Sequence, residues 1–176
     1  MNILQHPVKR YFLVLVLICS NQLMTQAQSA PSKEEKKAAN EAMIKNLVDS
    51  QTYKFVAQSA MPMSGRTRQL TSDYDLKITK TTVVSYLPYF GRAYTAPMDP
   101  TRSGIQFTSK DFDYTVTERT KGGWDVRIKP KDYRDVQQMS LSISTDGYAS
   151  LQVTSTSRQM ISFNGYIKAI PPKKSK

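Results

Sequence analysis

The fold is decided by residues 112–129, which read FDYTVTERTKGGWDVRIK. Apolar residues occupy every second position over residues 112–116 and again over 124–128, and polar residues fill the positions between them. Such alternation is typical of strands with one dry and one wet face. The Gly122-Gly123 step between the two runs has the chemistry of a tight turn. The stretch therefore predicts two antiparallel strands joined by a hairpin.

The same period of two recurs along most of the chain, and Thr145-Asp146-Gly147 supplies a second hairpin turn. Connections are mostly short, and no long helical segments alternate with the strands, which favours an antiparallel meander over a parallel sheet. The further segments predicted as strands are 53–58, 74–79, 83–87, 105–107, 139–143, 149–153 and 161–167.

A helix is predicted ahead of the strands, from about Ser32 to Ser50. Ser32 and Glu35 have the spacing of a capping box, and Glu34 and Glu35 suit the positive end of a helix dipole. Apolar residues follow at helical spacing and predict a stripe that faces the core. The stripe consists of Ala39, Met43 and Leu47, with Ile44 and Val48 beside it.

These patterns together predict a mainly β protein. An N-terminal α-helix, within residues 28–52, packs on a strongly curved antiparallel sheet of about eight or nine strands, within residues 53–170. The sheet is either a calycin-like barrel or a two-sheet sandwich. Residues 171–176, PPKKSK, are predicted to be a disordered basic tail.

Residues 1–27 have the order of a secretory signal peptide. Lys9 and Arg10 form a basic start, residues 11–19 are apolar, and Ala27 is a small residue before the expected cut; a cut after Ser29 is the alternative. The apolar run is too short to span a membrane, so no transmembrane helix is expected in the mature chain. The expected location is the periplasm or the cell envelope.

The single His and the single Cys both lie in that segment, as His6 and Cys19. Bulky Ile18 before Cys19 disfavours lipid modification of this cysteine. The mature chain then has neither imidazole nor thiol, which excludes a Ser-His-Asp triad, thiol catalysis and His- or Cys-based metal sites. The sequence also has no phosphate-binding loop and no dinucleotide fingerprint. We therefore expect no enzymatic activity, no metal and no cofactor.

Carboxylates are the remaining acid–base option. Asp73 and Asp75 are two residues apart, as are Asp111 and Asp113, so each pair would share one face of a strand. Such pairs can serve a glycosidase or hold calcium. Alternating aspartates opposite aromatic residues are also the ordinary wet face of a half-buried sheet, and this interpretation is favoured. A carboxylate-dependent glycan hydrolase is kept as a second alternative.

The formal net charge of +11 raises the question of an anionic partner. The basic residues are scattered along the sequence, and secretion removes intracellular nucleic acid as a partner. Acidic glycans and lipid head groups match the charge. A solvated surface that keeps the protein soluble explains the same charge and is the favoured interpretation.

The longest connection between predicted strands starts with residues 86–94, YLPYFGRAY. Long loops often carry function, and aromatic rings around an arginine are typical of recognition surfaces. The guanidinium of Arg92 could hold a carboxylate or phosphate while rings pack the rest of a ligand. Alternatively, Pro88 and Gly91 fix a loop that closes one end of the sheet, and Arg92 pairs with a neighbouring Asp. The predicted ligand-binding residues are Tyr86, Tyr89, Phe90, Arg92 and Tyr94.

The same stretch resembles a known family. Residues 86–94, Phe107, Trp124 and the late segment ISFNG at 161–165 are similar to the secreted bacterial proteins catalogued as domain of unknown function 4251. The resemblance extends from Tyr53 to about Ile167. It implies a secreted single domain, and it brings no activity, substrate or catalytic residue.

The sequence thus leads to two non-enzymatic hypotheses. The first is an envelope or periplasmic protein that binds an apolar or amphipathic small ligand, with the loop of residues 86–94 at the mouth of the sheet. The alternative is an envelope interaction module for a protein or a glycan. It predicts a filled core and a flat aromatic patch. Neither hypothesis fixes the oligomeric state.

Overall fold

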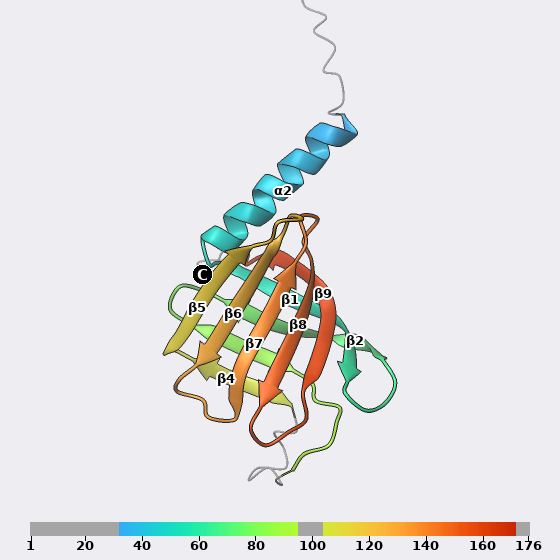
Figure 1. Cartoon of the computed structure of the whole chain (residues 1–176), viewed down its shortest axis with the longest axis vertical. Helices are drawn as coiled ribbons and strands as arrows, with labels where there is room; N and C mark the ends of the chain where they lie inside the picture. Colours follow the sequence, from blue (N-terminus) through green and yellow to red (C-terminus); the bar gives the residue numbers. More distant parts are fainter. Residues whose placement is uncertain (1–31, 95–103, 172–176) are drawn as a thin grey trace, which may run out of the picture. The chain divides into compact units, whose positions relative to one another are not determined.

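A computed structural model describes residues 32–94 and 104–171 (Figure 1). The predicted signal segment and nearly all of the predicted basic tail lie outside these residues. The described elements belong almost entirely to one compact unit, Glu34–Lys176. No helix in the described part is long and apolar enough to cross a membrane.

Among the described residues, one helix precedes nine strands. The helix is α2, Lys33–Asp49, which confirms the predicted N-terminal helix. The strands are β1 (Tyr53–Pro62), β2 (Arg68–Ile78), β3 (Val83–Leu87), β4 (Ile105–Ser109), β5 (Phe112–Glu118), β6 (Trp124–Pro130), β7 (Val136–Ile143), β8 (Tyr148–Ser155) and β9 (Ile161–Ala169).

The nine strands form one antiparallel sheet in the order β4-β3-β2-β1-β9-β8-β7-β6-β5. Each strand pairs with its neighbours in sequence except across the β4–β5 step, and β1 pairs with β9. The sheet therefore curls into a nearly closed barrel whose two free edges are β4 and β5. Figure 1 shows β5–β9 crossing in front of β1–β4. Of the two predicted architectures, the barrel is the one that forms.

The β5–β6 hairpin forms as residues 112–129 predict. The side chains of Trp124, Val126 and Ile128 point into the core, and the residues between them face water. Gly122 and Gly123 have φ angles of 86° and 88°, a left-handed conformation that favours glycine. Tyr114 pairs with Ile128 across the ladder, so the apolar faces of both strands coincide.

Side chains fill the interior of the barrel. Buried residues from the helix and from most strands form a single hydrophobic cluster. Large side chains occupy its centre, which is the close packing expected of a protein core. The largest fully buried side chains include Tyr53, Phe55, Phe163, Leu76, Met139, Leu141 and Leu151.

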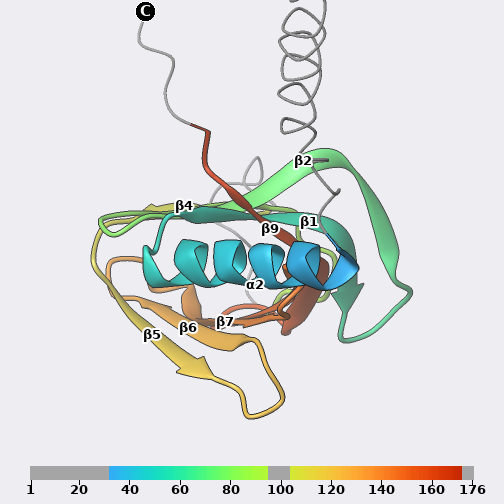
Figure 2. The same cartoon turned by 90° about the horizontal axis from the view of Figure 1, so that it is seen from above.

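The helix lies across one end of the barrel, between the two layers of strands (Figure 2). Ile44 and Val48 are its buried residues, at 2% and 0% exposure. The Asn40 amide donates to the backbone oxygen of Asp146 at 3.3 Å, and the Lys45 ammonium lies 2.6 Å from the Glu118 carboxylate. The helix is thus attached to the end of β5 and to the β7–β8 turn.

The predicted core stripe of the helix is partly wrong. Ala39 and Met43 are exposed, Met43 at 53%, and Leu47 is half-buried. The flanking pair Ile44 and Val48 faces the core instead. Two apolar stripes overlap on this helix, and its two buried residues, Ile44 and Val48, both lie in its last two turns. The angle at which the helix packs on the barrel therefore determines which stripe is buried. This angle cannot be inferred from the spacing of the apolar residues in the sequence.

Two tyrosine hydroxyls meet beneath the helix. The Tyr53 and Tyr114 oxygens are 3.1 Å apart, and the Tyr114 hydroxyl donates to the backbone oxygen of Val48 at 3.4 Å. Burial raises the pKa of Tyr53 well above 10.0, and burial also raises the pKa of Tyr114. Both hydroxyls therefore remain protonated at neutral pH and connect the helix to β1 and β5.

Val48→Ala tests the docking of the helix. Removing two buried methyl groups costs about 1–2 kcal/mol of unfolding free energy, slightly offset by the better helix propensity of alanine. Urea denaturation followed by circular dichroism measures this loss. Met43→Ala on the exposed face is the matched control and should leave stability nearly unchanged. Equal losses in both variants would contradict the observed packing.

Candidate functional site

Tyr86 lies in the predicted strand 83–87 and not in the loop that follows it. It belongs to β3, faces outward and is 48% exposed. Its ring stacks on that of Tyr74, with centroids 5.6 Å apart and an interplanar angle of 26°. Tyr86 is therefore one member of an aromatic pair whose other member, Tyr74 on β2, is half-buried and packs against the hydrophobic core.

Tyr89 ties the loop to the connection between β8 and β9. Its hydroxyl lies 2.9 Å from the backbone oxygen of Arg92 and 3.0 Å from that of Gln159, and it can donate to either. The guanidinium of Arg158 lies 5.2 Å from the centre of its ring. Burial raises the pKa of Tyr89. The hydroxyl therefore stays protonated and can connect the two loops through a hydrogen bond.

Backbone hydrogen bonds extend this attachment. The Tyr94 amide donates to the Ser157 oxygen at 2.7 Å, and the Gln159 amide donates to the Arg92 oxygen at 3.1 Å. Ala93 and Arg158 form an antiparallel bridge between them. The loop is thus held against the β8–β9 connection, at the end of the barrel away from the helix.

The arginine that pairs with an aspartate here is Arg158. Its Nε lies 3.6 Å from the Asp135 carboxylate, and its Nη1 donates to the Gly104 oxygen at 3.1 Å. Ser157 Oγ also donates to Asp135. Arg92 is exposed and forms no ion pair with any residue that the structure describes. The prediction of an Arg92–Asp pair is therefore not met within the described residues.

The five predicted site residues do not converge. Phe90 is half-buried, with the Arg68 guanidinium 4.8 Å from its ring centre. Tyr94 is 67% exposed. Tyr89 contributes to the closed end of the barrel and Arg92 faces water. None of the five lines the pocket that the structure shows elsewhere.

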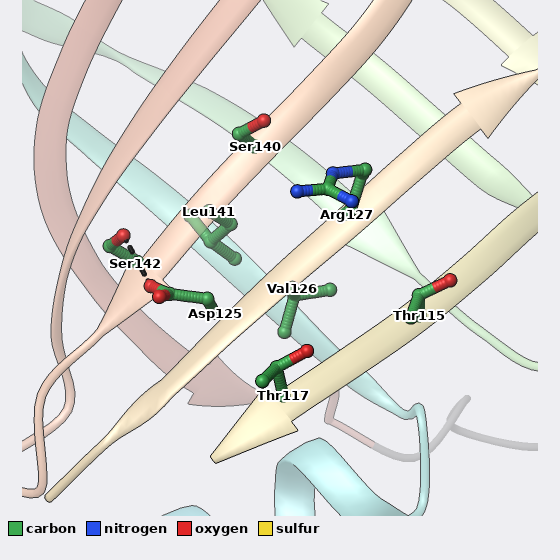
Figure 3. Close-up of a pocket in the computed structure, with 8 residues that line it drawn as sticks. All are labelled: Thr115, Thr117, Asp125, Val126, Arg127, Ser140, Leu141 and Ser142. Atoms are coloured by element: carbon green, nitrogen blue, oxygen red, sulfur yellow. Dashed lines mark hydrogen bonds between the residues drawn. The ribbon is translucent and has the colours of Figure 1, made fainter. Parts of the chain in front are cut away.

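That pocket lies on the outer face of β5, β6 and β7 and has a volume of about 240 Å³ (Figure 3). Six of its lining side chains are polar. The lining residues are Thr115, Thr117, Asp125, Val126, Arg127, Ser140, Leu141 and Ser142.

Strand register builds the pocket as two rows. Arg127 on β6 stands between Thr115 on β5 and Ser140 on β7. Two residues earlier on β6, Asp125 stands in the same way between Thr117 and Ser142. Directly opposed side chains in a sheet are close neighbours. The hydroxyl groups therefore flank one cation and one anion.

The two charged groups of the pocket have different surroundings. Asp125 Oδ1 accepts a hydrogen bond from Ser142 Oγ at 2.6 Å and lies 3.8 Å from Arg119 Nε. Arg127 is exposed and pairs with no carboxylate among the described residues. In Figure 3 its guanidinium extends toward Ser140, away from the Asp125–Ser142 bond. The pocket thus presents the Asp125 carboxylate as a positioned acceptor, and the Arg127 guanidinium as a donor that can bind a ligand.

Sequence reasoning missed this pocket. Alternation places Thr115, Asp125 and Arg127 on the wet face, and counting back from the Gly122-Gly123 turn would pair Thr115 with Arg127. Ser140 and Ser142 reach the pocket through the β6–β7 register, which no turn motif in the sequence specifies. A polar face with no aromatic residue also gives no conspicuous signal.

One member of each predicted carboxylate pair has a lysine partner. Asp75 lies 3.4 Å from Lys77, and Asp113 lies 2.6 Å from Lys131. Asp111 accepts hydrogen bonds from Ser109 and from the Lys131 amide through its backbone oxygen. In the described part of the chain, no three His, Cys, Asp or Glu side chains are grouped to hold a metal ion.

Comparison with known proteins identifies relatives of this fold. The model of the DUF4251 family, a domain of unknown function, matches residues 35–167. The crystal structure of a DUF4251 family protein from Bacteroides eggerthii DSM 20697 is similar at 13% sequence identity with a TM-score of 0.55. This similarity covers 76% of the present chain and 91% of the other. A search of curated proteins found no match. Because the family match spans most of α2 and the sheet as far as Ile167, the chain belongs to the DUF4251 family.

Proposed function

We propose that this protein is a secreted, non-enzymatic binding module of the periplasm or cell envelope. It binds a hydroxyl-rich ligand, such as one residue of a glycan, on the outer face of β5–β7. The observation that carries this proposal is the pocket built from two aligned rows of polar side chains around Arg127 and Asp125. This is the interaction-module hypothesis, with the contact moved from the loop to the sheet.

The packed interior favours a site on the surface. Side chains such as Phe55, Met139 and Phe163 are fully buried at the centre of the barrel. An apolar ligand inside the barrel would have to displace them. The loop of residues 86–94, expected at the mouth, is bonded to the β8–β9 connection through Tyr89 and the backbone. Under the proposal this loop closes the barrel and the ligand binds elsewhere.

The chemistry of the pocket suits a sugar. Each Ser or Thr hydroxyl both donates and accepts, the Asp125 carboxylate accepts, and the Arg127 guanidinium donates. Such a set complements the vicinal hydroxyl groups of a saccharide. At about 240 Å³ the pocket is smaller than the ~300–1,000 Å³ typical of drug-sized ligands, which suits one small ring. The open outer surface leaves room for the rest of an oligosaccharide.

Arg127→Ala is the variant that tests the proposal. Hydrogen bonds to a charged group contribute about 1.5–3 kcal/mol, so losing this donor should weaken glycan binding at least about tenfold. A glycan array of neutral and uronic-acid oligosaccharides identifies the probe, and isothermal titration calorimetry then measures its affinity. Because Arg127 is exposed, the melting temperature should stay close to that of the wild type.

Lys129→Ala is the matched control. Lys129 is exposed on the same face of the same strand, one row away from Arg127, and its loss removes the same charge. Glycan binding should survive this change. The proposal fails if the wild-type protein binds no glycan on the array, or if both variants lose equal affinity. An apolar molecule that co-purifies inside the barrel, seen by native mass spectrometry, would instead support the first hypothesis, in which a small apolar ligand binds at the mouth of the sheet.

A further inference from the structure

Three lysines stand side by side on the opposite part of the sheet. Lys54 on β1 pairs directly with Lys77 on β2 and with Lys168 on β9. All three alternate with buried residues along their strands, so their side chains lie on the outer face. Lys77 and Lys168 are exposed and Lys54 is half-buried between them. We call Lys168, Lys54 and Lys77 the lysine row.

This arrangement of three lysines lowers the stability of the folded protein. Like charges directly opposite each other in a sheet are destabilising, and Lys54 has one on each side. Within the described residues, only Lys77 has a carboxylate close to it, Asp75 at 3.4 Å. Scattered surface charge would keep the protein soluble without aligning three cations. The row therefore points to a use for the concentrated charge.

Tyrosines accompany the row on the same face. Lys168 Nζ lies 4.7 Å from the ring centre of Tyr166, two residues earlier on β9. In the next register position along the sheet, Tyr86 on β3 pairs with Asp75, and its ring is 48% exposed. The outer face of the barrel thus carries a line of ammonium groups with aromatic rings beside it.

We propose that the lysine row binds a linear acidic polysaccharide that runs across the strands. Neighbouring strands are about 4.8 Å apart, so the row offers cations at a regular spacing along a line perpendicular to β1. An extended chain of uronic-acid residues presents carboxylates along one line, which matches that geometry. The Tyr86 ring can pack against the apolar face of a sugar. This face is formed by β9, β1 and β2, so the inference does not depend on the pocket at Arg127.

An acidic chain fits this face better than an anionic membrane. Membrane-surface elements insert bulky apolar side chains between the lipids and place cations around them. Here, among the described residues, the strongly exposed large side chains next to the row are two tyrosines, Tyr86 at 48% and Tyr148 at 66%, and each carries a polar hydroxyl group. The other neighbours, Val56 and Val84, are half-buried in the sheet. This face of the barrel is therefore mainly polar.

The test compares the purified wild-type protein with the triple variant Lys54→Gln, Lys77→Gln and Lys168→Gln. The probe is polygalacturonate, with neutral dextran as its uncharged counterpart. Exposed ion pairs contribute about 0.2–1 kcal/mol each, so the variant should bind polygalacturonate roughly tenfold more weakly. Added salt should weaken the wild type more than the variant. The variant should also melt at the same or a higher temperature, because repulsion within the row is removed.

The matched control carries Lys36→Gln, Lys37→Gln and Lys121→Gln. These exposed lysines lie on α2 and in the β5–β6 turn, and their loss changes the net charge equally. The control should bind polygalacturonate as the wild type does. The inference is overturned if the control loses as much affinity as the row variant. Binding to phosphatidylglycerol vesicles without binding to polygalacturonate would also overturn it.

Discussion

Gly165→Ala is expected to prevent stable folding. Gly165 lies in β9 where this strand pairs with Ala57 of β1 and Ala149 of β8. A Cβ at this position would lie 1.9 Å from the backbone oxygen of Val56 and 3.1 Å from the Ala57 Cα. A backbone cannot move aside as a flexible side chain can, so β1 and β9 would have to separate. That pairing joins the first strand of the barrel to the last.

The expected cost exceeds that of an ordinary core substitution. Overpacking costs about 1–3 kcal/mol, and a clash with backbone on a central ladder should reach or exceed the upper value. A domain of this size has about 5–15 kcal/mol of total stability and loses about 2–4 °C of melting temperature for each kcal/mol. We therefore expect insoluble protein, or a melting temperature lowered by roughly 10 °C.

Asn164→Ala is the control for this result. Asn164 is the neighbouring residue in β9, is exposed, and contacts Met61 weakly through its amide at 3.7 Å. Its substitution should change stability by less than about 0.5 kcal/mol. Differential scanning fluorimetry on both variants decides the matter. If Gly165→Ala melts within a few degrees of the wild type, β1 and β9 do not approach as closely as the structure indicates.

Gly165 also marks the limit of the sequence analysis. Alternation over residues 161–167 correctly predicts a strand, and the run of such strands with one leading helix correctly predicts a curved antiparallel sheet. The need for glycine comes from Val56, far away in the chain. A period of two contains no information about which strand lies across the ladder. Strands were therefore predictable, whereas the order that closes the barrel was not.

The difference between neighbours in sequence and neighbours across strands also explains which candidate sites could be predicted. The loop of residues 86–94 is predicted as a site because aromatic rings and an arginine are adjacent in its sequence. In the structure Tyr89 points to Gln159, and Tyr86 stacks on Tyr74. The pocket and the lysine row are built from side chains that share a face only through register, such as Arg127 with Ser140. Sites made by cross-strand alignment leave little trace in a single sequence.

Arg158→Ala should open the end of the barrel away from the helix. The Arg158 side chain is 10% exposed and its partner Asp135 is 26% exposed, so the pair is largely removed from water. Removing one partner of a buried pair costs about 3–5 kcal/mol, and partial exposure reduces this to about 2–3 kcal/mol. The Gly104 oxygen also loses a donor and the Tyr89 ring loses its cation. Thermal and urea denaturation measure the loss.

Arg92→Ala is the comparison that separates the two interpretations of the loop. Arg92 is exposed and unpaired among the described residues, so its removal should cost less than about 0.5 kcal/mol. Hydrogen exchange at the Tyr94 amide, which donates to Ser157, should accelerate in Arg158→Ala and stay slow in Arg92→Ala. If Arg92→Ala is the more damaging variant, the loop is held by its own arginine. If Arg158→Ala is the more damaging, the loop is a structural closure, and binding must be sought on the outer faces of the sheet.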